Sequence, residues 1–344
     1  MQKPVLVIKL GSATISKADG SINKIIIKKI ADEIAVLSAN WRIVLVSSGA
    51  VGSGKSSIQN YKGSITERKA AAAVGNPILI QLYHKYFHRH GISVAQALCE
   101  RHHFSNRLQF LQLKETFTAF WNNNILPVVN ENDLVSNIEL KFSDNDELAT
   151  LIAVGFDAAT LIVCTSVGGF LDGEKKIIPV IEKIDKNIQG YVQNDKSSLG
   201  LGGMLSKLTF TRLATSLGIK VIICGLKKTD FFTSALQGLN GTTFIPQKSN
   251  FKARQKWLAS GSITLGNIAL DAGAAKALAN RKSLLTVGIK QVEGNFTSGE
   301  VVQLMNDAQE IIGVAKVKLD AKEMRSQIAQ KNTVAAHADD IVIF

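Results

Sequence analysis

Two lysines lie next to glycine-containing turns, where each ammonium group could bind an anion. Lys9 stands near the end of the apolar run Val5–Leu10, which has the composition of a buried strand, and Gly11 follows it. Lys207 comes shortly after the pair Gly202-Gly203, at the start of a helical stretch. A lysine in the first turn of a helix opposes the helix dipole, but this position is tolerable if the lysine binds phosphate. Because ligands of open α/β sheets bind at the carboxyl ends of the strands, these lysines predict a phosphate site there.

Acidic and amide side chains gather at two further places, each at the end of a strand-like run or the start of a helix-like run. The first is Asn130-Glu-Asn-Asp133 and the second is Ser143-Asp-Asn-Asp146-Glu147. Such groups can hold an ammonium group, a metal ion or a catalytic lysine. Asp and Asn are also favoured helix caps, so capping remains the alternative interpretation of each cluster.

The segment Gly49–Ser56 fits the P-loop pattern G-x-x-x-x-G-K-[ST], with Lys55 as its lysine, and follows the strand-like run Arg42–Ser48. A P-loop leads directly into a helix, whereas residues 57–63 show no helical period and end in a glycine. We also find no later apolar run that ends in an Asp suited to hold Mg²⁺. A glycine-rich turn that binds a small anion therefore fits these residues better, and a P-loop NTPase is the alternative.

The pattern of nucleophiles and bases also limits the chemistry. We find no Ser-His-Asp set and no catalytic Cys-His pair. This absence is compatible with phosphoryl transfer to a carboxylate. A carboxylate is ionised at neutral pH and needs no general base to attack phosphorus. It needs charge neutralisation and alignment, which two lysines, Mg²⁺ and backbone N–H groups provide. His84 and His88 could share a helix face, but no further ligand stands at metal-site spacing, so we expect surface histidines and no metal site built from side chains.

The first 250 residues alternate short apolar runs with helical stretches. The expected strands are 5–10, 42–48, 92–95, 125–129, 159–165, 220–224 and 242–245. The expected helices are 22–38, 67–90, 107–123, 146–157 and 204–218, the second of them interrupted near Asn76-Pro77. This alternation predicts an α/β fold with a mostly parallel sheet sandwiched by helices.

The pattern changes after residue 250. The polar, basic stretch 248–256 marks a linker, and frequent glycines with short β runs follow it. One short helix is expected near 271–280. We therefore predict three parts: a domain at 1–250, a linker at 251–262, and a small β-rich, barrel-like domain at 263–344.

The composition is that of a globular protein with a surplus of basic residues. No apolar run approaches the roughly 18 residues of a membrane helix, and no signal peptide is recognisable, so we expect a cytoplasmic protein without a membrane partner. Three widely spaced cysteines, Cys99, Cys164 and Cys224, predict reduced, buried thiols. The net charge of +12 is spread along the chain, with +9 on residues 1–250 and +3 on the rest, so it favours anionic ligands in general as much as RNA.

An ordered set of short motifs resembles the amino-acid kinase family over almost the whole chain. The motifs are Val7-Ile-Lys9-Leu-Gly11-Ser, Val46-Ser-Ser48-Gly49-Ala, Ala73-Val-Gly75, Asn130-Glu-Asn-Asp133, Asp144-Asn145-Asp146 and Gly202-Gly203-Met204-x-x-Lys207. The C-terminal part resembles a PUA domain, in Ile263-Thr, Ala269-Leu-Asp271-x-Gly273, Gly294-Asn-Phe296 and Gly299-Glu300-Val. A kinase domain joined to such a tail resembles the glutamate-phosphorylating branch of the family more than its acetylglutamate, aspartate, carbamate or UMP kinases.

The resemblance implies ATP-dependent phosphorylation, with Mg²⁺, of the γ-carboxylate of L-glutamate to give L-glutamyl 5-phosphate, the first step of proline biosynthesis. It also implies proline as a feedback inhibitor and a homo-oligomeric protein. An RNA-binding protein that uses the PUA-like tail is a further alternative, since such tails often serve RNA-modifying enzymes. Against it, the tail carries no interleaved basic and aromatic residues.

The resemblance also assigns roles by position. Lys9 and Lys207 would bind the transferring phosphoryl group, and Asp146 would hold both lysines in place. The acceptor site would contain Ser48, Gly49, Asn130, Asp133 and Asn145. The nucleotide site would contain Lys9, Gly11, Thr165, Ser166, Leu201, Gly202, Gly203, Met204, Leu205, Ser206 and Lys207. Three of these depart from the family pattern: Ser166 replaces an Asp, and Leu201 and Leu205 replace small polar residues.

Overall fold

The computed structural model describes residues 2–17, 19–105, 107–134, 145–193, 204–248, 266–328 and 333–343. The chain divides into two compact units. The first contains Met1–Glu100 and Gln112–Lys248, and the second contains Arg101–Leu111 and Ser249–Phe344. Among the residues described, no helix is both long and apolar enough to cross a membrane.

The first unit is built on an eight-stranded sheet with the order β3-β4-β2-β1-β5-β7-β8-β6. Its strands are β1 (Val5–Leu10), β2 (Arg42–Ser47), β3 (Ser93–Cys99), β4 (Ile125–Glu131), β5 (Thr160–Cys164), β6 (Val180–Ile181), β7 (Lys220–Cys224) and β8 (Thr242–Phe244). Neighbouring strands run parallel except β7 and β8, which pair antiparallel. The predicted mostly parallel sheet is confirmed. Of these strands only β6 lacked a prediction, because a strand of two residues leaves no period to detect.

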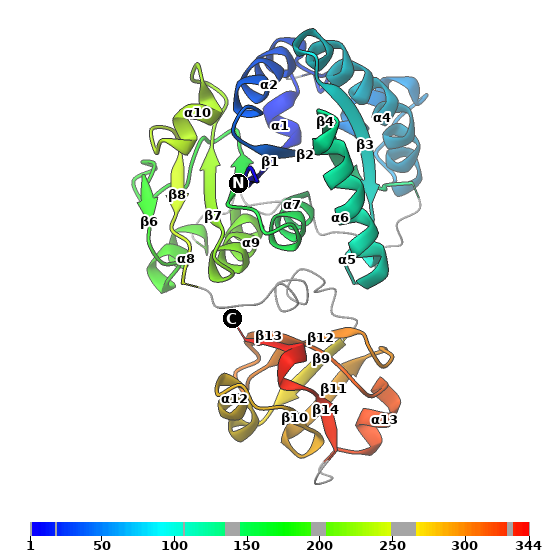
Figure 1. The fold of residues 1–344 in the computed structure, drawn as a ribbon, viewed down its shortest axis with the longest axis vertical. Helices are drawn as coiled ribbons and strands as arrows, with labels where there is room; N and C mark the ends of the chain where they lie inside the picture. Colours follow the sequence, from blue (N-terminus) through cyan, green and yellow to red (C-terminus); the bar gives the residue numbers. More distant parts are fainter. Residues whose placement is uncertain are drawn as a thin grey trace. The chain divides into compact units, whose positions relative to one another are not determined.

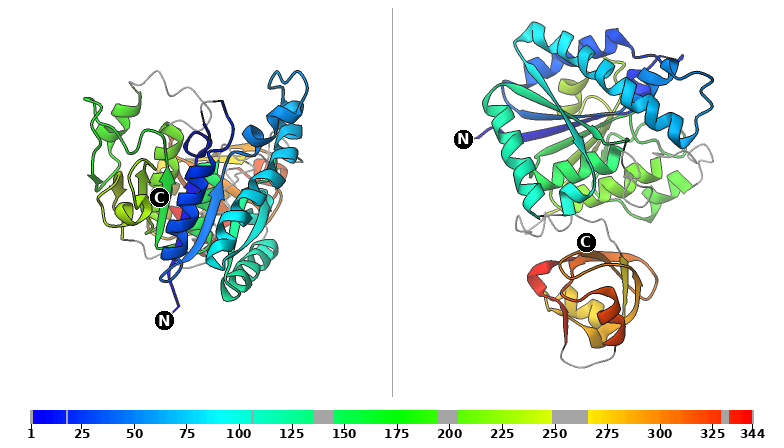
Figure 2. Two further views of the ribbon diagram at one scale, coloured as in Figure 1. Left: turned by 90° about the horizontal axis from the view of Figure 1, so that it is seen from above. Right: turned by 90° about the vertical axis from the view of Figure 1, so that its right-hand side faces the viewer.

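Helices cover both faces of this sheet (Figures 1 and 2). One face carries α1 (Ser12–Ile15), α2 (Lys24–Leu37), α3 (Ala50–Gly54), α4 (Ile65–Phe87) and α10 (Phe231–Leu236). The other carries α6 (Arg107–Asn122), α7 (Asn145–Gly155), α8 (Lys186–Gln193) and α9 (Met204–Ser216); α5 (His102–Ser105) precedes α6. Because both faces are covered, the central strands are apolar almost throughout, as expected for a buried parallel sheet.

Strand β1 divides its side chains between the two faces. Leu6, Ile8 and Leu10 are fully buried and belong to the core beneath α2 and α4. Since side chains alternate along a strand, Lys9 points to the opposite face, which α7 covers. Strand β1 thus places Lys9 within the sheet and directs its side chain toward α7.

Helix α4 runs without a break through Pro77, so the predicted interruption is wrong. Proline removes the N–H that would bond to the carbonyl of Ala73. Ala73 and Pro77 are both exposed, so water can bind the freed carbonyl and the helix continues. A capping box between Ser64 and Glu67 fixes its start, and hydrogen bonding at that box lowers the pKa of Glu67.

The P-loop pattern does not form a P-loop. Residues 50–54 form α3, and Lys55 begins a short 3-10 helix. A Cβ atom at Gly54 would overlap the carbonyl of Ala71 in α4, so the second glycine of the pattern allows two helices to touch. The Lys55 ammonium lies beside Gly20. The match to the P-loop pattern therefore has two other causes: Gly54 is needed for the packing of α3 against α4, and Lys55 is directed at the turn that contains Gly20.

The second unit is rich in strands, as predicted. A five-stranded sheet has the order β11-β9-β12-β13-β15, and β10 pairs with β14. These strands are β9 (Gly266–Leu270), β10 (Leu284–Leu285), β11 (Ile289–Gly294), β12 (Val301–Met305), β13 (Ile311–Lys316), β14 (Val334–Ala336) and β15 (Ile341–Ile343). The expected helix is α12 (Ala272–Ala279); a second helix, α13 (Ala321–Ser326), was not predicted. Apolar side chains from both sheets form a separate core.

The contact between α3 and α4 leads to a first prediction. A Cβ atom at Gly75 would overlap the carbonyl oxygen of Ala50, and backbone cannot move aside as a flexible side chain can. Gly75→Ala should therefore lower the free energy of unfolding by about 1–3 kcal/mol, the usual cost of overpacking. Gly190→Ala is the matched control, because no atom lies within 4 Å of a Cβ in that helix. It should be neutral or stabilising by up to about 1 kcal/mol.

Urea unfolding of the three proteins, followed by circular dichroism, gives the measurement. Equal stability of Gly75→Ala and the parent protein would show that α3 and α4 can separate freely.

Candidate active site

The parallel strands bring the predicted residues to one edge of the sheet. Lys9 lies near the end of β1, Ser48 directly follows β2, Asn130 lies near the end of β4, and Thr165 directly follows β5. These strands are neighbours in parallel register, so their carboxyl ends meet at the same edge. This is the edge at which open α/β sheets bind ligands.

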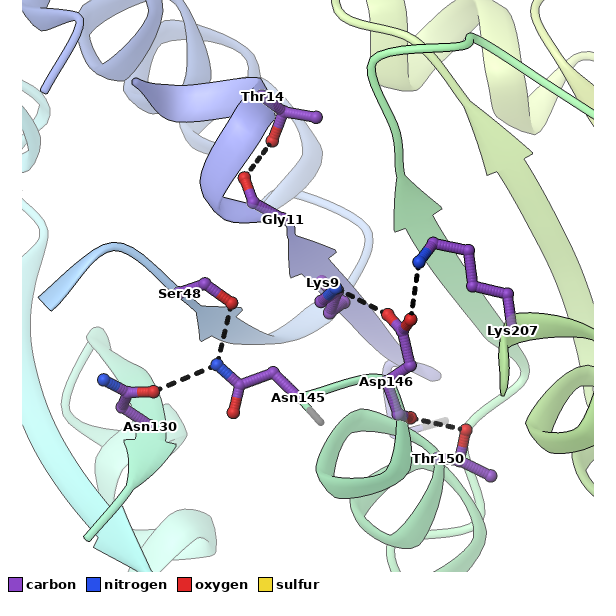
Figure 3. A network of polar contacts seen from close by, with 9 residues as sticks. All are labelled: Lys9, Gly11, Thr14, Ser48, Asn130, Asn145, Asp146, Thr150 and Lys207. Atoms are coloured by element: carbon purple, nitrogen blue, oxygen red, sulfur yellow. Dashed lines mark hydrogen bonds and ion pairs between the residues drawn. The ribbon is translucent and has the colours of Figure 1, made fainter. Parts of the chain in front are cut away.

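Two lysines share one buried carboxylate at this edge (Figure 3). The Lys9 ammonium lies 2.6 Å from Oδ1 of Asp146, and the Lys207 ammonium lies 2.9 Å from Oδ2. The side chains are 6% and 12% exposed for the lysines and 2% exposed for the aspartate. The contact joins β1, α7 and α9, three elements that are far apart in the sequence.

The charges in this group do not cancel. Two ammonium groups and one carboxylate leave a formal charge of about +1 in a buried place, where solvent screens charge weakly. Asp146 lies in the first turn of α7, where the helix dipole favours a carboxylate, and Thr150 binds the Asp146 carbonyl at 2.8 Å. Lys207 lies in the first turn of α9, which is tolerable because Asp146 is its counter-ion. The arrangement can bind an anion such as a phosphoryl group.

An amide network lies beside the lysines. The side-chain N–H₂ of Asn145 donates to the Ser48 hydroxyl at 2.8 Å and to Oδ1 of Asn130 at 3.1 Å. Asn130 in turn donates to Oδ1 of Asn76 at 3.2 Å, and its own Oδ1 also accepts from the backbone N–H of Glu131. Within the described ranges, Oδ1 of Asn145 has no donor. It is therefore an acceptor available for a cationic or N–H group of a ligand.

Consecutive residues of α7 serve the two groups. Asp146 points to the lysines, whereas Asn145 points to Ser48 and Asn130 (Figure 3). The first turn of α7 therefore separates an anion-binding side from an amide-lined side. A reaction between an anion and a polar acceptor could take place between them.

Hydrogen bonds to α4 and to the end of β1 hold the end of β2 in place. Ser47 and Tyr83 of α4 share a buried hydrogen bond of 2.7 Å between their hydroxyl groups, and burial raises the pKa of Tyr83. The backbone N–H of Ser48 donates to the carbonyl of Leu10, which joins the turns after β1 and β2. Gly49 then takes the left-handed conformation at φ 109°, which a residue with a side chain would adopt only with strain.

The turns after β1 and β5 also approach each other. A Cβ atom at Gly11 would lie 3.3 Å from the carbonyl of Cys164 and 3.7 Å from the Lys9 ammonium, so this glycine leaves room next to the lysine. Thr165 is buried, and its hydroxyl accepts from the N–H groups of Val167 and Gly168. Ser166 is exposed.

For most of the other predicted site residues the structure gives burial or backbone position. Met204 and Ser206 lie half-buried in the first turn of α9 with Lys207. Asp133 lies two residues beyond β4 and is half-buried. Leu201, Gly202 and Gly203 lie outside the described residues, and for Leu205 only the backbone is described. The structure thus brings together Lys9, Asp146 and Lys207, and separately Ser48, Asn130 and Asn145, while the roles of the others stay predictions.

The sequence analysis missed one member of the network, Asn76. It lies inside α4, and a buried Asn in a helix interior needs a partner, which Asn130 supplies. An Asn directly before Pro77 drew attention only as a possible helix end. The available signal was a polar residue on the buried face of a helix.

The described residues hold no cluster of three or more His, Cys, Asp or Glu side chains that could bind a metal ion. The exposed rings of His84 and His88 stack with centroids 5.5 Å apart. All three cysteines are buried and free, as predicted, and burial raises the pKa of Cys99 to about 12.

An open, mostly parallel sheet with a buried Lys-Asp-Lys group at its carboxyl edge defines an anion-binding α/β protein of the phosphotransferase type. Comparison with known proteins then identifies the family. The model of the amino acid kinase family matches residues 4–225, and the PUA domain matches residues 266–337. The chain belongs to the amino acid kinase family.

Two relatives are similar over nearly their full length. The glutamate 5-kinase of Bacteroides thetaiotaomicron is 35% identical over 338 residues, covering 94% of each chain. The glutamate 5-kinase of Aquifex aeolicus is 36% identical over 355 residues, covering 98% of this chain and 99% of the relative. The solved structure of Giardia carbamate kinase has a TM-score of 0.52 at 17% identity and covers 72% of this chain and 100% of its own, which supports the fold of the first unit.

The shared carboxylate leads to a second prediction. Asp146→Asn keeps the shape of the side chain but removes the buried negative charge that both Lys9 and Lys207 contact, so it should cost about 3–5 kcal/mol of folding free energy. Added phosphate or sulfate should recover part of that loss, because an anion can replace the carboxylate charge. Glu174→Gln, which breaks the exposed pair with Lys176, is the control and should change stability little.

The free energies of unfolding of the parent protein and both variants are measured by urea unfolding with and without phosphate. If Asp146→Asn is as stable as the parent protein, the lysines do not depend on this carboxylate.

Proposed function

We propose that this protein phosphorylates the γ-carboxylate of L-glutamate with ATP to give L-glutamyl 5-phosphate, the first step of proline biosynthesis. The observation that carries the proposal is the placement of Asp146 between Lys9 and Lys207, next to the amide network of Asn145. Similarity over almost the whole chain to proteins named glutamate 5-kinase supports the choice of acceptor.

The reaction needs charge neutralisation more than proton transfer. An oxygen of the glutamate γ-carboxylate forms a bond to the γ-phosphorus of ATP, the bond from that phosphorus to the β–γ bridging oxygen breaks, and ADP leaves. The carboxylate is already ionised near pH 7, so no proton has to move. Lys9 and Lys207 bind the transferring phosphoryl oxygens, and Asp146 holds both ammonium groups in position, which is electrostatic preorganisation.

The amide-lined side holds the acceptor. The free Oδ1 of Asn145 and the carboxylate of Asp133 are suited to the ammonium group of an amino acid, and the Ser48 hydroxyl can donate to a carboxylate. Gly49 and Asn130 complete this side by fixing the turn and the amide of Asn145. The proposal therefore assigns the cationic α-amine to Asp133 and Asn145 and the reacting carboxylate to the space next to the lysines.

The nucleotide occupies the side bounded by the turns after β1 and β5 and by the start of α9. Gly11 leaves room near Lys9, and the proposal assigns Thr165, Ser166, Met204 and Ser206 to this side. Mg²⁺ fits this site as an ion bound mainly by phosphate oxygens and water, because the nearest buried carboxylate, Asp146, is held by two lysines. When bound, the ion neutralises charge on the phosphates.

Regulation and assembly follow from the same proposal. Proline has an α-carboxylate and a cationic amine but no second carboxylate to accept phosphate. It should occupy the recognition part of the acceptor site without reacting and inhibit competitively with glutamate. We also propose that the protein is a homo-oligomer, as the family resemblance implies.

The third prediction tests the lysines. Lys9→Met and Lys207→Met keep side-chain volume but remove the charge, and each should lower kcat by about 10²–10³, the usual loss when one charge contact is removed from a preorganised site. Lys55→Met is the matched control from the P-loop pattern, and it should retain most activity because its ammonium lies beside Gly20. The assay measures ATP- and Mg²⁺-dependent acyl phosphate, trapped with hydroxylamine.

Loss of activity in Lys55→Met with normal activity in Lys9→Met would instead support a P-loop NTPase. Melting temperatures of all three variants separate lost chemistry from lost folding.

The fourth prediction concerns the acceptor. Aspartate is one methylene shorter than glutamate, so its reacting oxygen falls about 1 Å or more short of the in-line position, which can cost about 10²-fold in rate. N-acetylglutamate lacks the cationic amine that we assign to Asp133 and Asn145, and the loss of that charge-assisted contact also weakens binding. Asp133→Asn should narrow the difference between glutamate and N-acetylglutamate.

Steady-state kinetics with the three acceptors, with and without proline, gives the answer. A preference for N-acetylglutamate in the parent protein would contradict the assignment of Asp133, and a lack of competition between proline and glutamate would contradict the proposed inhibition.

A further inference from the structure

A pocket of about 250 Å³ lies at the opposite edge of the sheet from Lys9. Its walls come from the segment before β1, the turn between α2 and β2, and the turn between α6 and β4. Because β1, β2 and β4 run parallel, this is where their amino ends meet. The lining of the pocket includes two cationic side chains, Lys3 and Arg42, and the large apolar side chains of Trp41, Ile92 and Trp121.

The charges in the pocket wall have one sign. Lys3 and Arg42 line it, and no Asp or Glu does. Within the described part of the chain neither cation forms an ion pair: Lys3 donates to the carbonyl of Ser38 at 2.9 Å, and Arg42 donates through Nε to the carbonyl of Lys3 at 2.8 Å. The terminal N–H₂ groups of Arg42 therefore remain for a ligand. Burial lowers the pKa of Arg42, which indicates that the pocket partly dehydrates the guanidinium and that an anion there would compensate it.

Aromatic and aliphatic side chains form part of the remaining wall, together with the neutral polar residues Gln2, Ser38, Asn122 and Asn124. Trp41 and Trp121 are half-buried, and Ile92 is buried. The indole N–H of Trp121 donates to the carbonyl of Ile43 at 2.9 Å, and the Arg42 guanidinium stacks over its ring at 4.9 Å from the centroid. These two contacts fix an aromatic face next to a cation in the free protein, so a ligand would meet a preformed site.

The size of the pocket narrows the ligand class. Sites for drug-sized ligands have volumes of about 300–1,000 Å³, so this pocket suits a single ring better than a nucleotide. A flat ring can lie against the indoles while an attached carboxylate or phosphate binds Arg42 and Lys3.

The pocket is also connected to the candidate active site through one helix. Trp121 packs edge-on against Phe117 and Phe156, with ring centroids 6.2 Å and 6.1 Å away. Phe156 directly follows α7, whose first turn carries Asn145 and Asp146. Phe156 lies ten positions after Asp146, which corresponds to about 15 Å of helical rise, and every residue of α7 from Asp146 on is buried. A shift of Trp121 would thus displace Phe156 at the end of α7, the helix that carries Asn145 and Asp146 in its first turn.

We propose that this amino-edge pocket binds a small single-ring organic anion and that its occupancy changes catalysis at the carboxyl edge. The binding part stands on the pocket alone, and the catalytic part rests on the proposed function. The two are therefore tested with separate measurements.

Binding is measured by calorimetry and tryptophan fluorescence with benzoate and phenyl phosphate, in a Trp257→Phe background so that only Trp41 and Trp121 emit. Benzamide, which has the same ring without the charge, should bind at least about 10-fold more weakly than benzoate, because a charge-assisted hydrogen bond is lost. The two anions distinguish a carboxylate ligand from a phosphate ligand. Equal binding of benzoate and benzamide, or no binding of either anion at millimolar concentration, would overturn the proposal.

Variants locate the site. Arg42→Gln and Lys3→Gln should each raise the Kd for the preferred anion, Arg42→Gln by about 10-fold or more. Arg89→Gln is the matched control, since Arg89 also stacks on an aromatic ring, that of Tyr86, but outside the pocket. Equal effects of Arg42→Gln and Arg89→Gln would overturn the assignment, and Lys3→Gln decides if Arg42→Gln proves unstable.

Catalytic coupling is measured as kcat and KM for glutamate at zero and saturating anion. A change in either constant that disappears in Arg42→Gln supports control from the pocket. Unchanged constants with demonstrated binding would overturn the catalytic part. A protein without kinase activity would contradict the proposed function and leave the binding result standing on its own.

Discussion

The carboxylate of Asp146 is the interaction on which the site depends. Each of its two oxygens contacts one ammonium group, so the carboxylate joins β1, α7 and α9. Strand β1 and helix α7 are more than a hundred residues apart in the sequence. The two lysines and the aspartate together carry a formal charge of about +1 at a place where water screens charge poorly. In the proposed function, this preformed group of charges binds the phosphoryl group at a place that the backbone geometry fixes.

The same helix turn fixes the second half of the site. Consecutive residues of an α-helix point about 100° apart, so Asn145 and Asp146 must face different directions. One reaches the amides and hydroxyl at the ends of β4 and β2, and the other reaches the lysines. In the proposed function, one peptide unit at the start of a buried helix then sets the distance between the acceptor and the phosphoryl group. Alignment of two reactants to within about 1 Å is most of what a reaction without proton transfer requires.

Much of this could be predicted from the sequence, and the parts that could not have physical reasons. A charged residue inside an apolar strand and glycines next to lysines are local signals, so Lys9 and Lys207 were found, and the sheet followed from strand–helix alternation. The hydrogen bond from Asn130 to Asn76 joins residues 54 positions apart and leaves no local pattern. Pro77 stays within α4 because Pro77 and Ala73 are exposed, and Lys55 is directed at Gly20; both outcomes depend on which residues the tertiary structure buries.

Helix α7 explains why the site can be formed before any ligand binds. A surface helix has one apolar face, but α7 is buried on all sides from Asp146 to Gly155, so its surroundings leave it little freedom to move alone. That rigidity keeps both lysines and the amides aligned, which lowers the reorganisation needed during phosphoryl transfer. The same rigidity has a second consequence. A stiff helix that begins at Asn145 and is followed directly by Phe156 cannot absorb a disturbance at one end, so a change in the packing of Trp121 against Phe156 must either be resisted there or shift Asn145 and Asp146.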